Sequence, residues 1–132
     1  KADIYLFTSD FNEGWGAVLN ESMNSGCAVV ASHAIGSVPF LIKNGENGLI
    51  YENGNQLDLE KQVLRLLEDG AFRKKIAENA YETMINLWNA ETAAERFLTL
   101  AEKLLKNENT DSLFRDGPCS KAAILKNDWY QH

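Results

Sequence analysis

Short apolar runs alternate with a segment of helical character along the first quarter of the chain. Residues 3–9 (DIYLFTS) and 27–32 (CAVVAS) are apolar runs of strand length, which favours strands buried on both faces of a parallel sheet. Between them, helix-forming residues run from about Gly16 to Ser25, and Gly26 is a natural C-terminal stop. Strand, helix and strand in this order predict a βαβ unit.

Turn signals dominate the next segment, from residue 33 to residue 55. Gly36 and Pro39 indicate a turn before the apolar residues FLI, and NGENG provides two Asn-Gly turn signals around a short third strand, LIY. The pattern therefore predicts a third strand joined to the second by an irregular connection.

Three segments with helical periodicity follow, over residues 56–68, around residues 72–84 and over about 90–107. We interpret each apolar stripe as core packing rather than as a cofactor-binding surface. The stripes consist of Leu59, Val63, Leu66 and Leu67, then Phe72, Ile76, Ala80 and Met84, and then Ala94, Phe97, Leu98, Ala101, Leu104 and Leu105.

The pattern divides the chain into an α/β unit over residues 1–106 and a polar tail over residues 107–132. The tail contains the helix-breaking pair Gly117-Pro118 and ends in a short amphipathic segment. The α/β unit has too few strands for a complete doubly wound domain. Because the chain opens almost inside its first apolar run, we expect it to be a fragment.

Charge and cysteine content narrow the possible functions. The 132 residues carry a net charge of −6, which argues against nonspecific binding to nucleic acids or anionic membranes. Cys27 and Cys119 are too few for a disulfide framework, and we interpret Cys27 as a small buried apolar residue. No apolar stretch approaches the roughly 20 residues of a membrane span. We expect a cytosolic protein.

The stretch NEGWGAVLNESMNSG, residues 12–26, combines two acidic residues with two glycines where a ligand is expected. In open parallel sheets, ligands bind outside the carboxyl ends of the strands, and this stretch follows the first predicted strand. The N-terminus of the next helix favours a phosphate, and Gly14 and Gly16 let an anion approach the backbone. A phosphate does not explain Glu13, whose carboxylate is suited to accept hydrogen bonds from sugar hydroxyls.

Glu21 lies five residues beyond Gly16, or roughly 7.5 Å along the helix axis. This is similar to the spacing between a diphosphate and the ribose of one nucleotide, so the stretch suggests a nucleotide-sugar. Taken alone, Glu13 and Glu21 favour a simpler interpretation, in which the helix dipole stabilises acidic residues on a solvated face.

A resemblance over a longer stretch favours the nucleotide-sugar site over the solvated acidic face. The sequence EGWGAVLNESMNSGCAVVAS, followed by GSVP and NGENGLIYENGN, resembles the nucleotide-sugar-binding half of the retaining family 4 glycosyltransferases, the group 1 glycosyl transferases with the GT-B fold. The family signature has two glutamates separated by seven residues, as Glu13 and Glu21 are here. A small-Gly-x-x-Val-Val strand, a Gly-x-Pro turn and an N-G-x-x-G element follow in the family's order. The resemblance covers about residues 2–105.

The resemblance implies an α/β fold with a partial Rossmann-like parallel sheet and flanking helices. Residues 1–106 would form part of the donor-binding, C-terminal domain of a GT-B enzyme. Residues 107–132 would form a C-terminal tail, in which AAILKNDWYQ is a candidate for a helix that crosses to the other domain. In that case Leu125 and Trp129 would be exposed here.

The resemblance also assigns roles to residues of the acidic-glycine stretch. It places Glu13 beside the donor sugar, as the candidate catalytic residue, and it lets Glu21 bind the ribose hydroxyls. The other substrate-binding candidates are the backbone of Gly14, Trp15 and Gly16, which would meet the sugar and phosphates, and Val18 and Leu19 along the diphosphate.

Three departures from the family pattern stand out. Trp15 stands where Phe is usual, and Phe40 replaces the glutamate of a Gly-Gly-x-Pro-Glu turn, so we expect Phe40 to pack. The Arg/Lys pair that clamps the diphosphate in the family has no counterpart in this chain. We interpret Lys43 as a surface charge and His33 as a turn histidine rather than as replacements for that pair.

The sequence predicts a fragment of a retaining glycosyltransferase. Such an enzyme takes a nucleotide-diphosphate sugar, commonly a UDP-sugar, and glycosylates a saccharide or lipid-linked acceptor in bacterial polysaccharide or glycoconjugate synthesis. With no Asp-x-Asp motif, we expect no metal and no cofactor. A missing N-terminal domain of the same protein would bind the acceptor, in the cytoplasm or peripherally at the inner membrane face.

Two alternatives remain open. One is a noncatalytic nucleotide-sugar-binding or regulatory module, and the other is a protein-interaction module whose helices over residues 56–105 form a partner surface. Because the diphosphate clamp is absent, we expect weak donor binding and no transfer by this chain alone.

Overall fold

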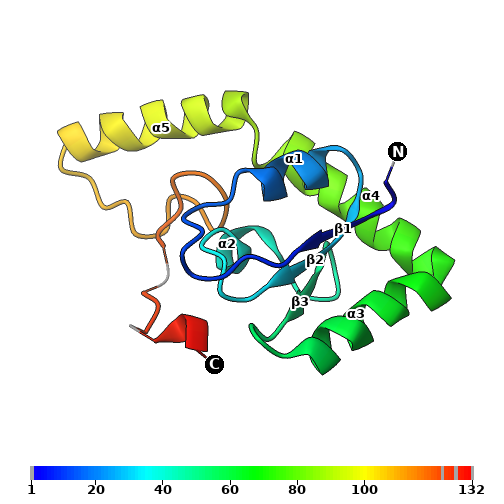
Figure 1. The fold of residues 1–132 in the computed structure, drawn as a ribbon. Helices are drawn as coiled ribbons and strands as arrows, with labels where there is room; N and C mark the ends of the chain where they lie inside the picture. Colours follow the sequence, from blue (N-terminus) through cyan, green and yellow to red (C-terminus); the bar gives the residue numbers. More distant parts are fainter. Residues whose placement is uncertain (1, 123, 127, 132) are drawn as a thin grey trace.

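The computed structural model describes residues 2–122, 124–126 and 128–131 and shows a small parallel sheet with helices around it (Figure 1). The elements follow in the order β1 (Ile4–Phe7), α1 (Val18–Asn24), β2 (Ala28–Ser32), α2 (Val38–Leu41), β3 (Leu49–Tyr51), α3 (Gln56–Glu68), α4 (Gly70–Asn86), α5 (Ala90–Leu105) and the 3₁₀ helix η1 (Trp129–Gln131).

The three strands form one parallel sheet in the order β1-β2-β3. Ile4 of β1 pairs with Ala28 of β2, and Val30 of β2 pairs with Leu49 of β3. Every residue of β2 is buried, because β2 is the central strand and helices pack on both of its faces. The α/β prediction and the predicted βαβ unit are confirmed.

The expectation that the first strand is buried on both faces is wrong for β1. This strand lies at one edge of the sheet, and its residue Leu6 is 44% exposed, whereas Phe7 is buried. Side chains alternate between the two faces of a strand. Tyr5 and Phe7 therefore join the cluster beneath α1, while Leu6 lies on the opposite face, where α3 packs on β2 and β3 but makes fewer contacts with β1.

Two apolar clusters make up the core, one on each face of the sheet. The first brings Leu19 and Met23 of α1 against the sheet and includes Ala80 and Met84 of α4. The second contains Leu66 of α3 and residues from the first half of α4, and it rests on β2 and β3. The apolar stripes of α3 and α4 are thus core packing, as predicted, apart from the exposed Leu67.

Local sequence signals fix the helix boundaries. The side chains of Asn55, Asp69 and Asn89 each accept a hydrogen bond from a backbone N–H in the first turn of α3, α4 and α5. Gly26 follows α1 with a φ of +70°, and its N–H donates to the carbonyl of Met23. The connection predicted as a turn before FLI contains one helical turn, α2, with Pro39 near its start.

The expectation that the stripe of the third long helix is core packing is wrong. Helix α5 has no buried residue, and Phe97 and Leu98 are each 62% exposed. Figure 1 shows α5 lying apart from the sheet, beyond the end of α4. A 3.6-residue period requires only that one face of a helix be apolar, and nothing in the described part of the chain covers that face.

The tail folds back onto the joint between α4 and α5. Arg96 of α5 donates hydrogen bonds to the carbonyls of Asp116 and Pro118, and its guanidinium lies 4.7 Å from the ring centroid of Phe114. The described residues beyond 106 form no α-helix, only η1. Residues 123 and 127 of the AAILKNDWYQ segment lie outside the described residues, and its proposed crossover stays a prediction. No helix in the described ranges combines the length and apolar character of a bilayer span.

Candidate functional site

The loop of residues 8–17 leaves the carboxyl end of β1 and contains most of the candidate residues. An Asx turn shapes its first part, because Asp10 Oδ1 accepts hydrogen bonds from the backbone N–H and the side-chain amide of Asn12. The backbone N–H of Glu13 donates to the carbonyl of Asp10 at 3.0 Å. These bonds fix the turn that carries Glu13.

Glu13 lies at an open hollow at the end of β1. Its carboxylate accepts a hydrogen bond from Ser9 Oγ at 3.4 Å and remains half-buried. The hollow has a volume of about 390 Å³ and is lined by Thr8, Ser9, Asp10, Asn12 and Glu13. Because hydroxyl, amide and carboxylate groups gather there, the hollow is suited to a hydroxylated ligand such as a sugar.

The two glycines of the loop serve different purposes. Gly14 is exposed, and a Cβ placed on it would have no atom within 4 Å. Gly16 has a φ of +72°, and a Cβ there would lie 2.8 Å from the ring of Phe7. Backbone conformation and packing therefore explain Gly16. The sequence predicted that an anion could approach the backbone at both glycines, and only Gly14 leaves space for this.

Five successive backbone N–H groups, those of residues 14–18, have no hydrogen-bond acceptor among the described residues. Consecutive unpaired N–H groups in a turn form a concave site that attracts anions. Helix α1 starts only at Val18, and the N–H of Leu19 already donates to the carbonyl of Gly16. The loop and the first residue of α1 are thus the part of the backbone available to a phosphate.

Gly36 holds a second loop directly against the first. It follows the carboxyl end of β2, and a Cβ placed on it would lie 2.1 Å from the carbonyl oxygen of Gly14. Real Cβ atoms do not approach that closely, so the contact requires glycine. Sequence reasoning treated Gly36 only as a turn residue. Its position after the neighbouring parallel strand is the signal that could have placed it beside Gly14.

The candidates on α1 point in different directions. Leu19 is fully buried in the core, so only its backbone faces the loop, and Val18 packs partly against the same cluster. Glu21 is exposed and lines a separate cavity of about 530 Å³ between α1 and the start of α5. The structure thus gathers Glu13, Gly14 and Gly16 in one loop, while Glu21 lies in the exposed first turn of α1 and lines another cavity.

Trp15 extends from the loop over the protein surface. Its ring stacks on Phe40 at 5.9 Å between centroids and inclines against Trp88 at 5.7 Å. The indole N–H donates to Asn20 Oδ1 at 2.9 Å. Phe40 packs on Trp15 as predicted, although it is still 39% exposed.

Lys43 and His33 do not line the hollow at Glu13. The side chain of Lys43 is 66% exposed and lies 3.4 Å from Asp116, which confirms its interpretation as a surface charge. His33 Nδ1 accepts a hydrogen bond from the N–H of Asn53, as expected for a turn histidine. Cys27 is a buried free thiol, as predicted. Among the described residues, no three His, Cys, Asp or Glu side chains are grouped to hold a metal.

A family model described as Glycosyl transferases group 1 matches residues 1–83, which is more than half of the chain. These residues include β1 to β3, both loops of the site and most of α4. The match therefore covers all of the candidate site residues named above on the loop and on α1.

Several curated proteins are similar to the chain over most of its length. The D-inositol 3-phosphate glycosyltransferase of Corynebacterium glutamicum is 33% identical over 83% of the chain and 26% of its own length. The N,N'-diacetylbacillosaminyl-diphospho-undecaprenol alpha-1,3-N-acetylgalactosaminyltransferase of Campylobacter jejuni is 31% identical over 81% of the chain and 28% of its own length. The chain thus spans about a quarter of the length of these relatives.

Solved structures show the same fold. The C-terminal domain of a glycosyl transferase group 1 family protein from Francisella tularensis has a TM-score of 0.61 at 33% identity, covering 67% of this chain and 44% of that domain. HepE from Anabaena, solved in complex with UDP, has a TM-score of 0.67 at 29% identity, covering 79% of this chain and 28% of HepE. A further HepE structure contains UDP-glucose.

Proposed function

Because the chain belongs to the group 1 glycosyl transferases, we propose that it carries part of the donor site of an enzyme that transfers a sugar from a nucleotide diphosphate. The observation that carries this proposal is the loop of residues 12–17, with unpaired backbone N–H groups beside a half-buried carboxylate. UDP is the nucleotide we propose, because HepE, which is similar over 79% of the chain, was solved with UDP and with UDP-glucose.

The loop offers a different group to each part of the donor. The N–H groups of residues 14–17 would donate hydrogen bonds to the diphosphate, since none of them has an acceptor among the described residues. Glu13 would accept hydrogen bonds from the donor sugar, in the hollow that it shares with Ser9. Glu21 would bind the ribose hydroxyls from the exposed face of α1.

Transfer with retention of the anomeric configuration is the reaction we propose for the intact enzyme. The diphosphate leaves from the face of the sugar that the acceptor enters, and a diphosphate oxygen accepts the acceptor's proton. The protein contributes positioning and stabilisation of charge. Glu13 would place the sugar and stabilise positive charge that develops on its ring, and the reaction as proposed uses no metal and no cofactor.

A further domain of the same protein is the partner that we propose for this chain. It would supply the acceptor site and, with the residues preceding the matched part, the cations that pair with the diphosphate. Two surfaces support this: the open edge of β1 and the uncovered apolar face of α5. The relatives, which are about four times as long as the matched stretch, leave ample sequence for such a domain.

The acceptor that we propose is a saccharide or a lipid-linked saccharide, in bacterial polysaccharide or glycoconjugate synthesis. The name of the Campylobacter jejuni relative describes transfer to an undecaprenol-linked diphosphate sugar. We propose that the intact enzyme works in the cytoplasm or at the inner face of the membrane.

Donor binding is tested by calorimetric titration of the chain with UDP and UDP-glucose. We expect weak but saturable binding, which Glu21→Gln weakens about 10-fold through the loss of hydrogen bonds to a charged group. Glu60→Gln is the matched control, because Glu60 is an exposed glutamate on α3, away from the loop. No heat of binding at millimolar nucleotide, or equal effects of both variants, would contradict the proposal.

A second function is favoured by one observation, the exposed apolar face of α5. A protein-interaction role would use this face and would not need the loop of residues 12–17. The test is to substitute the apolar stripe of α5 and to measure both activities. If UDP still binds but association with the remainder of the protein is lost, the loop of residues 12–17 serves nucleotide binding and the α5 face serves protein interaction.

A further inference from the structure

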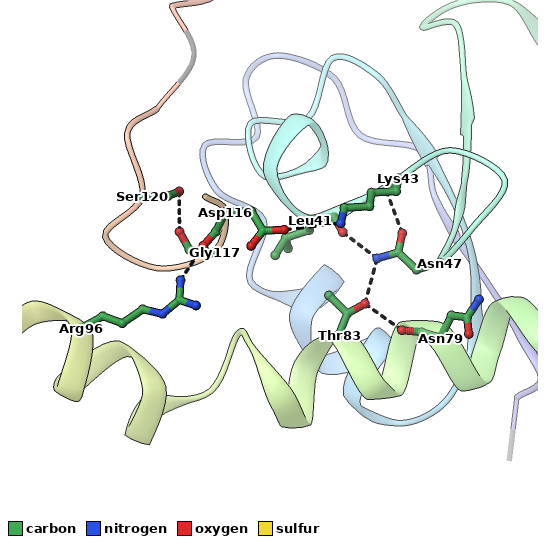
Figure 2. A network of polar contacts seen from close by, with 9 residues as sticks. All are labelled: Leu41, Lys43, Asn47, Asn79, Thr83, Arg96, Asp116, Gly117 and Ser120. Atoms are coloured by element: carbon green, nitrogen blue, oxygen red, sulfur yellow. Dashed lines mark hydrogen bonds and ion pairs between the residues drawn. The ribbon is translucent and has the colours of Figure 1, made fainter. Parts of the chain in front are cut away.

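A cavity beside α4, separate from the hollow at Glu13, has features of a saccharide site. It has a volume of about 370 Å³, and we name it the α4 cavity. Its walls come from α2, the loop before β3, α4 and the tail (Figure 2). The residues that matter for its chemistry are Phe40, Lys43, Glu46, Glu82, Asn86, Trp88 and Asp116.

One wall of the α4 cavity is aromatic. Phe40 and Trp88 line the cavity, and both contact the ring of Trp15. Phe40 is exposed and Trp88 is half-buried, so aromatic surface is left for a ligand. The stacking of Trp15 on Phe40 supports this wall from the side of the loop.

Helix α4 contributes hydrogen-bonding groups to the cavity that the fold does not use. Asn47 is fully occupied, since its amide donates to the carbonyl of Leu41 and to Thr83 Oγ1, while its oxygen accepts from the N–H of Lys43. In contrast, the side chains of Glu82 and Asn86 have no hydrogen-bond partner among the described residues. Two neighbouring positions of α4 thus present an acceptor and an amide to the cavity.

The charges around the α4 cavity select against phosphates. Lys43 is its single cationic lining residue, and it already pairs with Asp116, while Glu46 and Glu82 are acidic. The exposed ion pair of Lys43 contributes little and can rearrange around a ligand. A nucleotide or sugar phosphate would meet net negative charge, whereas an uncharged polyhydroxylated ring would find acceptors for its hydroxyls and an aromatic surface for its C–H face.

The cavity walls are held in place by interactions with the rest of the fold. Figure 2 shows Arg96 reaching from α5 to the 116–118 segment, and its guanidinium donates to the carbonyls of Asp116 and Pro118. Gly117 packs so closely on Leu87 that a Cβ would lie 2.6 Å from that side chain. Thr83 in turn donates to the carbonyl of Asn79 within α4. The backbone that forms the cavity is therefore in place before a ligand arrives, while the side chains of Glu82 and Asn86 remain free to bind it.

We propose that the α4 cavity binds an uncharged sugar residue of a saccharide, such as a hexose or an N-acetylhexosamine, independently of the nucleotide. Binding there would hold a saccharide chain on the donor domain, in addition to the donor site of the proposed function. The proposal goes beyond that function and does not require the loop of residues 12–17 to bind UDP.

The test is a titration of the isotope-labelled chain with maltose and with di-N-acetylchitobiose, followed by amide and indole chemical shifts. We expect millimolar binding of at least one disaccharide, with shifts at the Trp88 indole and the Asn86 amide that persist in saturating UDP. Glu82→Ala should weaken that binding at least 5-fold. Glu78→Ala, on the same helix one turn away, should leave it unchanged, because Glu78 does not line the cavity.

Phe40→Ala provides a second variant that does not depend on α4, since Phe40 lies on α2 and is already exposed. It should also weaken binding at least 5-fold while the spectrum stays that of a folded chain. Shifts confined to residues 12–21, equal effects of Glu82→Ala and Glu78→Ala, or no shift with either sugar up to its solubility limit would overturn the proposal. A normal response to UDP in the same samples would leave the proposed function standing.

Discussion

Gly36 and Gly14 show how two small residues set the geometry of the candidate site. Their backbones touch, which brings the loop after β1 and the loop after β2 together at one edge of the sheet. Neighbouring parallel strands place their carboxyl ends side by side, so this contact follows from topology. The exact approach depends on the absence of a side chain at Gly36, and no local sequence signal encodes it.

Alanine at these two glycines should have different effects. Gly36→Ala forces a Cβ against the carbonyl of Gly14 and should lower the free energy of unfolding by about 1–3 kcal/mol. Gly14→Ala meets open space and should change stability by less than about 0.5 kcal/mol. Urea denaturation measures both values. Similar losses for the two variants would contradict the close contact.

Substitutions of Glu13 and Glu21 should affect different kinetic constants of the intact enzyme. Glu21→Ala should raise the KM for the donor about 10-fold or more, because hydrogen bonds that hold the bound nucleotide are lost. Glu13→Ala should mainly lower kcat, because its carboxylate would act on the sugar as charge develops. Steady-state assays with varied UDP-sugar distinguish these patterns, and an effect of Glu13→Ala on KM alone would contradict its role.

Tyr51 should make the fold sensitive to alkaline pH. Burial raises the pKa of the Tyr51 hydroxyl, and a hydrogen bond with Ser32 offsets part of that rise. A raised pKa in the folded state gives stability that is complete below the unfolded value near 10 and is lost as the pH rises above it. Tyr51→Phe should therefore lose less stability than the unmodified chain between about pH 9 and 11, as followed by chemical denaturation at each pH.

At the scale of elements, the sequence was informative where local signals and burial agree. Helix α3 occupies the predicted 56–68 span, because Asn55 caps it and Leu66 enters the core. Helix α5 has an equally clear stripe but no buried residue. The periodicity shows that one face of a helix is apolar but does not show what covers that face. Whether the α5 face is buried could therefore not be predicted from the pattern.

The exposure of α5 predicts that its apolar residues add little to the stability of this chain. Phe97→Ser should change the free energy of unfolding by less than about 0.5 kcal/mol, because the side chain is already in solvent. Leu66→Ala is the comparison within the core and should cost about 2–5 kcal/mol. Thermal and urea unfolding of both variants tests this, and a large loss with Phe97→Ser would show that the α5 face is covered.

At the scale of the whole molecule, the chain is an α/β unit that combines its candidate site with an open sheet edge at β1 and an uncovered apolar face on α5. The family and the parallel sheet could be predicted from sequence, because the motif order and the short apolar runs are local features. The positions of Glu13 and Glu21 relative to each other could not be predicted from the sequence. The first sits in a hollow after β1, and the second lines a cavity that also involves α4 and α5.

The lack of a cationic side chain beside the loop of residues 8–17 explains why the chain alone should bind a donor weakly. The loop offers backbone N–H groups but no cation, since Lys43 pairs with Asp116 at another surface. A diphosphate would thus be held by hydrogen bonds without a matching positive side chain. Other parts of the longer protein are expected to supply that charge.

The most direct test of the donor site is a two-dimensional amide NMR titration of the labelled chain with UDP-glucose. We predict saturable shifts at residues 12–21 and at residues 33–37, because the Gly14 and Gly36 loops form one surface, with the largest shifts at the unpaired N–H groups of residues 14–17. Shifts that avoid both loops, or no change at millimolar UDP-glucose, would contradict the account.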